Sequence, residues 1–221
     1  MMRVPRGNVV RAAIITVSAA VLLLQGAPAQ ATLIESWENT LDGWTVIDSN
    51  NYSSAFSTKT GVTDGTYSLA LTGTQAPGYG QMLRSQFAQS YTTILGNSSS
   101  LSLDVFGPAS SFGGFLQFDF DINNNDTGFV SLDSFSYPGI SPDGNEHTIT
   151  VPISPSLQAT LAASSNPTQI IIQIGGGFTA GNETMYLDNL RTVDLVPEPS
   201  TIALLATGLL GLVCIKRRRV S

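Results

Sequence analysis

The acidic and amide side chains between residues 119 and 126 form the densest group in this chain that could bind a cation. Asp119, Asp121, Asn123, Asn125 and Asp126 supply the oxygen atoms that calcium prefers. The run lacks the glycine at the sixth position and the glutamate at the twelfth that a helix–loop–helix calcium loop requires. A hairpin turn explains it better, because Asn and Asp tolerate left-handed backbone conformations.

The same acids could take part in glycoside hydrolysis, which uses two carboxyl groups. Two acids one residue apart on a strand face are too common to indicate that reaction. The chain contains no Gly-x-Ser-x-Gly and no His-Glu-x-x-His motif, and its only histidine, His147, follows a predicted turn at 143–145. Its only cysteine, Cys214, lies in an apolar C-terminal run. The sequence therefore favours a protein that is not an enzyme.

Polar positions of several alternating segments could form a face that hydrogen-bonds a ligand rich in hydroxyl groups. We expect them to share the open face of one sheet, and the main candidates are Arg84, Asp104, Gln117, Asp119 and Gln173. Sugar sites usually also offer an aromatic ring, because one face of a sugar is apolar. Trp37 and Trp44 are expected in or near the core instead. The alternative is an ordinary solvated sheet face.

Short runs of alternating apolar and polar residues predict β-strands, and Gly, Ser, Asn and Asp separate them. The predicted strands are 33–37, 66–72, 80–87, 101–106, 115–122, 129–136, 147–153, 168–174 and 185–193. Residues 168–174 are nearly all apolar, so this strand is expected at the centre of a sheet. Helix signals are nearly absent, and one short helix is predicted at 155–163 with Ser154 or Ser156 near its cap.

Eight or nine such strands predict an all-β fold of two stacked antiparallel sheets, a β-sandwich, because stacking buries one face of each sheet. No internal repeat is visible, which disfavours solenoids and propellers. The single cysteine excludes an internal disulfide, so the core alone must stabilise the domain.

The C-terminal segment 196–221 has a composition of its own. Two prolines break regular structure in Pro197-Glu198-Pro199, and an uncharged apolar run covers 201–215. The run ends in four cations, Lys216, Arg217, Arg218 and Arg219. A charge at the centre of a membrane helix costs about 2.5–3.5 kcal/mol, so this basic block should stay in the cytoplasm. The run is short against the roughly 20 residues that span a bilayer.

This order of parts resembles the PEP-CTERM sorting signal of exopolysaccharide-producing Gram-negative bacteria. The resemblance covers 196–219, and Pro197-Glu198-Pro199 carries it. It implies recognition at the inner membrane by an exosortase-type sorting enzyme, removal of the tail, and transfer to the cell surface or extracellular matrix. The membrane helix would then be a transient anchor. The alternative is a plain C-terminal anchor that is retained in the inner membrane.

The N-terminus predicts a signal peptide over 1–31. Arg3, Arg6 and Arg11 precede an apolar stretch at 12–24, and small residues at 27–31 fit a cleavage site. The alternative is an uncleaved N-terminal anchor. We therefore expect a signal helix at 1–31, a β-sandwich domain at 32–195 and the sorting signal with its membrane helix at 196–221.

The exported part is strongly acidic. Seven of the ten basic residues lie in the terminal segments, and only one of the sixteen acidic residues does, Glu198. Residues 32–196 therefore keep Lys59, Arg84 and Arg191 against fifteen acids, a net charge of −12. This charge argues against nucleic acid and anionic lipid as partners, since both require a cationic surface.

Several segments resemble carbohydrate-binding-module-like jelly rolls of the galactose-binding-like class. The resemblance rests on Ser36-Trp37-Glu38 with the Gly43-Trp44 that follows, and on 64–71, 147–153 and 186–190. It covers most of 33–193 and implies a jelly-roll arrangement of the sandwich. Many sandwiches without a sugar ligand share this order, so it predicts the fold rather than the ligand.

The same resemblance implies a structural calcium ion. In such modules a Glu of the first strand and an Asp of the last strand meet at one sheet edge, beside carbonyls of the loop before the second strand. The corresponding residues here are Glu38, Asp188 and the turn at Asp64. Calcium takes about six to eight oxygen ligands, which carboxylates and carbonyls supply. The alternative is that Asp188 caps a turn and Glu38 is solvated.

Together these features predict a non-catalytic, exported protein of the cell surface or extracellular matrix that binds polysaccharide. The alternative is a structural or adhesive matrix protein with no small ligand. A secreted glycan hydrolase is a more distant alternative.

Overall fold

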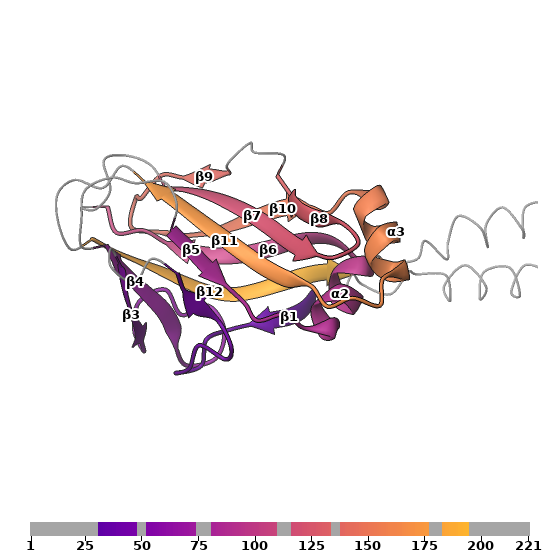
Figure 1. Ribbon diagram of the computed structural model, residues 1–221. Coiled ribbons are helices and arrows are strands. Elements are labelled where there is room, and N and C mark those ends of the chain that lie inside the picture. The colour runs from indigo at the N-terminus through magenta and orange to yellow at the C-terminus, as the bar shows by residue number, and fades with distance from the viewer. Residues whose placement is uncertain are drawn as a thin grey trace, which may run out of the picture. The chain divides into compact units, whose positions relative to one another are not determined.

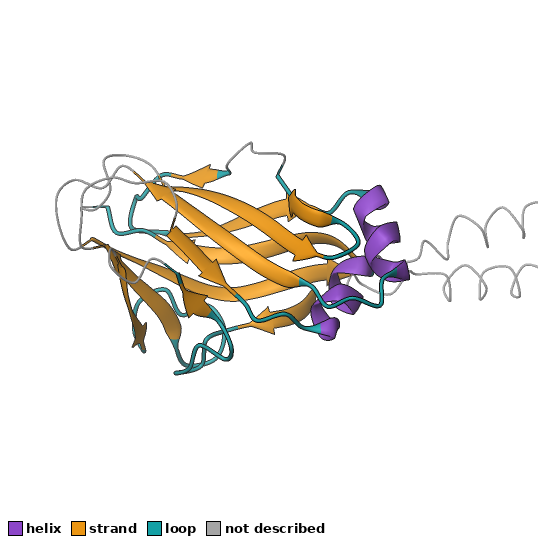
Figure 2. Ribbon diagram, in the orientation of Figure 1, coloured by secondary structure: helices purple, strands orange, loops and turns teal. Residues whose placement is uncertain are grey.

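Two antiparallel sheets stack face to face in the computed structural model, which describes residues 31–47, 52–73, 81–109, 116–133, 138–176 and 183–194 (Figure 1). Residues Gln30–Leu195 form one compact unit. The predicted signal helix and sorting signal lie outside the described residues. Strands dominate the described part, with two short helices at one end (Figure 2). The prediction of an all-β, two-sheet antiparallel sandwich is confirmed.

Sheet A contains six strands in the order β10-β6-β12-β4-β3, and β1 also pairs with β12. Their bounds are β1 Ala31–Glu35, β3 Tyr52–Ser57, β4 Ser68–Gly73, β6 Ser98–Phe106, β10 Glu146–Pro152 and β12 Glu183–Asp194. The longest strand, β12, pairs with β1, β4 and β6, and its register with β6 shifts between Asp188 and Arg191. At this irregularity Asn189 adopts a left-handed conformation, with φ of 51°.

Sheet B also contains six strands, in the order β2-β5-β11-β7-β8, with β9 paired to β7. Their bounds are β2 Thr45–Val46, β5 Gln81–Arg84, β7 Leu116–Asn124, β8 Gly128–Ser131, β9 Gly139–Ile140 and β11 Gln169–Gly176. Strand β11 lies between β5 and β7, as its nearly continuous apolar sequence predicted. The predicted hairpin turn joins β7 to β8, and Gly128, the first residue of β8, has a φ of +69°.

The core fills the space between the inner faces of the two sheets. Sheet B contributes Phe118 and Phe120, whose rings stack with centroids 6.4 Å apart, and sheet A contributes Leu103 and Leu187. All four are fully enclosed. Trp37, in the loop after β1, is also fully buried and meets Trp44 edge to face at 5.7 Å, so the prediction that both indoles belong to the core is confirmed.

Two helices lie side by side at one end of the sandwich (Figure 1). Helix α3, Pro155–Ala163, has the predicted bounds, and Ser154 caps it by accepting the Leu157 N–H at 3.3 Å. Helix α2, Gln89–Gly96, was not predicted, since its β-branched residues favour strands and no side chain caps its start. Packing holds it instead: a Cβ on Gly96 would lie 2.8 Å from the backbone nitrogen of Ala162.

Strand β3 was also missed by the sequence analysis. Three of its six residues, Tyr52–Ser57, are serine and three are exposed, as suits the edge of a sheet that faces solvent. Such a strand carries little apolar alternation, because only one of its edges and part of one face need to be buried. Among the described residues no helix is long and apolar enough to cross a membrane.

Candidate functional site

The outer face of sheet B carries the largest part of the predicted ligand-binding set. Because side chains alternate along a strand, the buried Phe118 and Phe120 of β7 direct Gln117, Asp119 and Asp121 to the opposite side. Strand β11 repeats this arrangement: Ile170, Ile172 and Ile174 lie in the core, and Gln169, Ile171 and Gln173 face the other side. We call this surface the sheet B outer face, and its described polar members are Thr45, Arg84, Gln117, Asp119, Asp121, Asn123, Ser131, Gln169 and Gln173.

Strand pairing arranges these side chains in rows across the sheet. One row runs through Arg84, Ile171, Asp121 and Ser131, and a neighbouring row places Gln173 opposite Asp119. Partners that lie directly opposite each other in an antiparallel pair share a face, with Cβ atoms about 4.5–5.5 Å apart. The face therefore presents amide and carboxyl groups within reach of one another.

One exposed aromatic ring lies on the same face. Phe129 of β8 is opposite Asn123 of β7, which in turn is opposite Gln169 of β11. The Phe129 side chain is 52% exposed, although large apolar side chains are usually buried. This row supplies an apolar ring beside two amide side chains. The sequence analysis missed Phe129, although its place next to Gly128 in a predicted alternating strand was a usable signal.

Three aspartates gather on this face, and we call them the Asp cluster: Asp119, Asp121 and Asp133. The Ser131 hydroxyl lies 3.1 Å from Asp119 Oδ1 and 2.7 Å from Asp133 Oδ1. From β11, the Gln173 amide donates to Asp121 Oδ2 at 2.7 Å and lies 3.4 Å from Asp119 Oδ2. The sequence analysis placed only Asp119 and Gln173 of this group in a ligand face.

The Asp cluster is enclosed. Asp119, Asp121 and Asp133 are 4%, 0% and 9% exposed, and Asp121 Oδ1 has no hydrogen-bond partner. Burial and the charge of Asp121 raise the pKa of Asp119 to about 7. Burial also raises the pKa of Asp121. The cluster therefore retains a proton near neutral pH, because carboxylates this close cannot all ionise at low cost.

The predicted ligand set is divided between the two sheets. Arg84, Gln117, Asp119 and Gln173 lie on strands of sheet B, whereas Asp104 lies on β6 of sheet A. The expectation that all five share one sheet face was therefore wrong for Asp104. Alternation along a strand shows which residues point the same way, but it does not show which sheet the strand joins.

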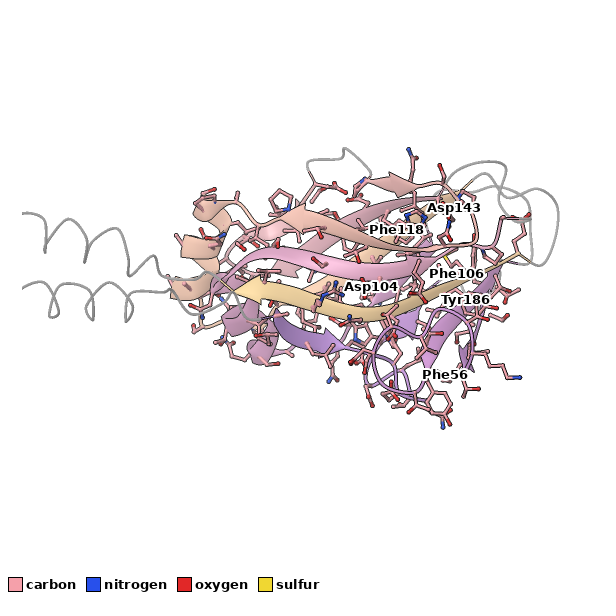
Figure 3. All side chains as sticks on the ribbon, turned by 180° about the vertical axis from the view of Figure 1, so that it is seen from behind. Phe56, Asp104, Phe106, Phe118, Asp143 and Tyr186 are labelled. Atoms are coloured by element: carbon pink, nitrogen blue, oxygen red, sulfur yellow. The ribbon has the colours of Figure 1, made fainter. Side chains whose placement is uncertain are left out.

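Asp104 makes a dense network on the outer face of sheet A (Figure 3). Its Oδ1 accepts the Thr148 hydroxyl at 2.6 Å, and its Oδ2 accepts Thr63 Oγ1, Asn189 Nδ2 and Arg191 Nη1 at 2.8–2.9 Å. Burial works to raise the pKa of Asp104, but the hydrogen bonds, that of Thr148 foremost, outweigh it and lower the pKa. Donors from two strands, β10 and β12, and from the loop at Thr63 already occupy both oxygens, so Asp104 joins structural elements together.

The residues of the predicted calcium site meet at one loop. Asp188 Oδ2 accepts the backbone N–H groups of Thr63 and Asp64 at 2.6 and 2.8 Å. The Glu38 carboxylate accepts the N–H of Thr66 at 3.0 Å and that of Tyr67 at 3.3 Å. The loop after β1 and the last described strand, β12, thus hold the loop before β4 from two sides, in the neighbourhood that the resemblance implied.

The donor set at this loop differs from that of a calcium shell. Calcium requires carboxylate and carbonyl oxygens, whereas amide hydrogens point at Glu38 and Asp188 here. Among the described residues, no group of three or more His, Cys, Asp or Glu side chains is placed to hold a metal ion. An ion would have to compete with these N–H groups for the same lone pairs. Calcium at Glu38, Asp64 and Asp188 therefore stays a prediction.

His147 lies at the surface, directly after the turn at 143–145 that the sequence predicts. Its Nε2 is 2.9 Å from Asp143 Oδ1, and both side chains are substantially exposed. His147 lies in β10 and Asp143 in the turn before it, so the pair belongs to sheet A, whereas Asp119 and Asp121 lie on sheet B.

A protein-family model matches the C-terminus. Residues 195–219 carry the PEP-CTERM protein-sorting motif, which contains Pro197, Glu198 and Pro199 and extends to the basic residues 216–219. The motif indicates export and C-terminal membrane anchoring for sorting. It confirms the sequence interpretation of this segment. None of the curated proteins matches the sequence.

Solved structures similar to this chain are carbohydrate-binding modules with a β-sandwich fold. A module from a study of promiscuous specificity in the β-sandwich superfamily has a TM-score of 0.55 and 16% identity; the alignment covers 76% of this chain and 64% of that one. A family 28 module specific for non-crystalline cellulose has a TM-score of 0.52 and 12% identity, covering 76% and 98%. A family 27 module of Caldicellulosiruptor saccharolyticus, solved with mannohexaose, has a TM-score of 0.50 and 15% identity, covering 73% and 96%.

These likenesses establish the fold of the described domain. At such low identity they do not assign a ligand, and the chain spans only about two thirds of the first of these structures. The resemblance to carbohydrate-binding-module-like jelly rolls is confirmed at the level of architecture.

Proposed function

We propose that this chain is a non-catalytic protein of the cell surface or extracellular matrix that binds polysaccharide on the sheet B outer face. The sorting motif at 195–219 supports export and processing by an exosortase-type enzyme. The carbohydrate-binding-module fold supports a role in binding rather than in catalysis.

The observation that carries the proposal is the row formed by Phe129, Asn123 and Gln169. It combines a 52% exposed aromatic ring with the half-buried amide of Asn123, which can donate and accept hydrogen bonds, while the buried Gln169 amide donates to the Ser85 carbonyl at 2.8 Å. A sugar ring needs both, because its apolar face stacks on an aromatic ring and its hydroxyl groups need polar partners. Gln117 and Gln173 extend the amide surface along the same sheet.

The test is binding of the full chain to a panel of neutral, acidic and amino-containing polysaccharides. The chain is held in a detergent without a sugar head group, so that the detergent does not compete. We expect Phe129→Ala to weaken binding by at least about ten-fold while the melting temperature stays unchanged, because an exposed ring adds little to stability. Gln173→Ala should weaken binding as well.

Leu33→Ala is the matched control. Leu33 is 47% exposed on β1 of sheet A, so its loss removes a similar apolar surface from the other sheet. We expect it to leave glycan binding unchanged. If no polysaccharide binds, the chain is better described as a structural or adhesive matrix protein without a small ligand.

A further inference from the structure

The two helices and the last residues of the longest strand meet at one end of the sandwich (Figure 1). One residue separates α2 from β6, and Ser98 of β6 pairs with Asp194, the last residue of β12. The Ser99 hydroxyl donates to the Val193 carbonyl at 3.1 Å, and the Ser99 carbonyl accepts the N–H of Ile153, two residues before α3. We call this region the helix end, and it consists of α2 with the preceding residues 85–88, α3 and the last residues of β12.

The described domain begins and ends at the helix end. Ala31 of β1 pairs with Val193 of β12, so the first and last described residues, Ala31 and Asp194, are neighbours. The predicted signal peptide ends at Ala31, and the sorting motif begins at residue 195. Whichever of these two segments attaches the chain to a membrane, the attachment point is therefore at the same end of the domain.

The link between the domain and the C-terminal apolar run is short. Six residues, 195–200, separate Asp194 from Thr201, where the uncharged run begins. A chain spans at most about 3.3–3.6 Å per residue, so this link reaches no farther than about 25 Å. The headgroup layer on one side of a bilayer takes up about 5–8 Å of that length. A helix is itself about 10 Å wide, so the helix end can touch the bilayer surface when the run is in the membrane.

The helix end is poor in charge, although the domain as a whole is strongly acidic. Residues 85–103, which include α2, and residues 148–182, which include α3, contain no Asp, Glu, Lys or Arg. Among the described side chains, the exposed acids that border this end are Asp42 and Asp126, and Asp194 ends β12. A surface with so few charges enters the headgroup region of a neutral bilayer at a low desolvation cost.

One large apolar side chain is exposed at the helix end. Phe87 lies two residues before α2 and is 50% exposed. The next residue, Ala88, pairs with Thr168 in an isolated bridge, which fixes the backbone beside Phe87. The exposed residues of α2 are polar and uncharged, and they are Gln89, Ser90 and Thr93. An exposed phenylalanine next to hydroxyl and amide groups suits the interface of a bilayer, where apolar side chains enter the headgroup boundary and polar ones stay hydrated.

We propose that the helix end of the sandwich lies on the surface of the bilayer that contains the C-terminal apolar run, with the Phe87 ring in the headgroup region. A single ring would bind a free domain weakly, but the short link keeps this surface at a high effective concentration beside the bilayer. Strands β7 and β11 run between the helix end and the opposite end. The sheet B outer face therefore stays open to ligands while the chain is anchored.

A second copy of the chain fits the helix end less well than a bilayer does. Stable protein interfaces bury about 800 Å² on each partner and have an apolar centre. Phe87 is the one large apolar side chain described as exposed on this end, so it supplies too little apolar area for such an interface. A bilayer requires less, because the chain is already attached to it.

The experiment measures the distance of two fluorescent labels from the lipid headgroups, on the full chain in phosphatidylcholine nanodiscs. Some of the lipids carry a nitroxide quencher on the headgroup. Cys214→Ala removes the single native cysteine, and Ser90→Cys then provides an exposed labelling site on α2. Ser141→Cys is the matched control, because this exposed serine lies between β9 and β10, at the opposite end of the sandwich.

The label at residue 90 should be quenched more strongly than the label at residue 141. The short link alone favours this order, so the decisive variant is Phe87→Ser, which should lower the quenching at residue 90 at least about two-fold. Its melting temperature should stay unchanged, because an exposed ring adds little to stability. Ile47→Ser is the matched control: it removes a 38% exposed apolar side chain that follows β2, and it should leave the quenching unchanged.

Three results would overturn the proposal. Equal quenching of both labels, or stronger quenching at residue 141, shows that the helix end does not face the bilayer. Unchanged quenching at residue 90 in Phe87→Ser shows that the link alone positions the domain. Stronger quenching at residue 90 that occurs in vesicles of the cell's inner membrane but not in nanodiscs shows that a membrane protein occupies this surface instead of lipid. Polysaccharide binding is tested separately through Phe129→Ala, so the failure of either proposal leaves the other intact.

Discussion

The carboxylate of Glu38 lies directly over Gly65, and it accepts the N–H of the next residue, Thr66, at 3.0 Å. Gly65 has a φ of +64°, which disfavours any residue with a Cβ. A Cβ at this position would also collide with the Glu38 carboxylate. Gly65 therefore allows the loop before β4 to approach the loop after β1 closely.

The first prediction compares two glycines with the same backbone conformation. Gly128 has a φ of +69°, but nothing lies within 4 Å of where its Cβ would be. We expect Gly128→Ala to lower the free energy of unfolding by about 1 kcal/mol and Gly65→Ala by about 2–3 kcal/mol, because only the second adds a clash to the backbone strain. Chemical denaturation measures both. Equal losses would show that Glu38 moves away without cost.

The second prediction concerns Asp188 and calcium. In EDTA, Asp188→Ala should lower the free energy of unfolding by about 2 kcal/mol, because the N–H groups of Thr63, Asp64 and Asn189 lose their acceptor. In the unmodified chain, saturating calcium should raise the melting temperature relative to EDTA, since an ion that binds only the folded state stabilises it. That rise should vanish in Asp188→Ala. An unchanged melting temperature would show that the loop is held by N–H groups alone.

The third prediction is a dependence of stability on pH that originates at Asp119. Its pKa is raised from 3.8 to about 7 in the folded state, so between these values the folded state binds more protons than the unfolded one. Stability from this group is therefore complete below about pH 4 and is lost as the pH rises through about 7. We expect the free energy of unfolding of the unmodified chain to fall, relative to that of Asp119→Asn, by an amount of the order of 2 kcal/mol as the pH rises through this window. Denaturation midpoints at several pH values measure it, and parallel curves for the two proteins would contradict the prediction.

The sequence predicts the sandwich well because its strands carry strong periodic signals. In β7 the buried Phe118 and Phe120 alternate with Asp119 and Asp121, and this period of two identifies both the strand and its inner face. Helix α2 gives no such signal, because contacts with α3 determine it rather than its own propensity. Local patterns predict elements that bury a face by themselves, and they miss elements that depend on a distant partner.

The candidate site shows the same limit. Alternation identified Asp104 and Asp119 as outward-facing polar residues, but only the pairing of strands assigns them to different sheets. The β7–β8 hairpin brings Phe129 and Asp133 to the same face as Asp119. This proximity is not visible in the sequence, because the residues are separated along the chain. Which residues of different strands come together in a site depends on the order of the strands in the sheet. A single sequence does not contain this order.

The last prediction separates a buried ion pair from an exposed one. Arg191 Nη1 lies 2.9 Å from Asp104 Oδ2, and the two side chains are 22% and 9% exposed. Asp104→Ala should lower the free energy of unfolding by about 3 kcal/mol, because it leaves Arg191 and three further donors without their acceptor. Arg191→Met should lower the free energy of unfolding by less, since Asp104 keeps its other donors.

Asp143→Ala, which removes the exposed partner of His147, should cause no measurable change, because solvated pairs contribute little. A loss in Asp143→Ala as large as that in Asp104→Ala would contradict the view that the stability of this face depends on burial of the Asp104 network.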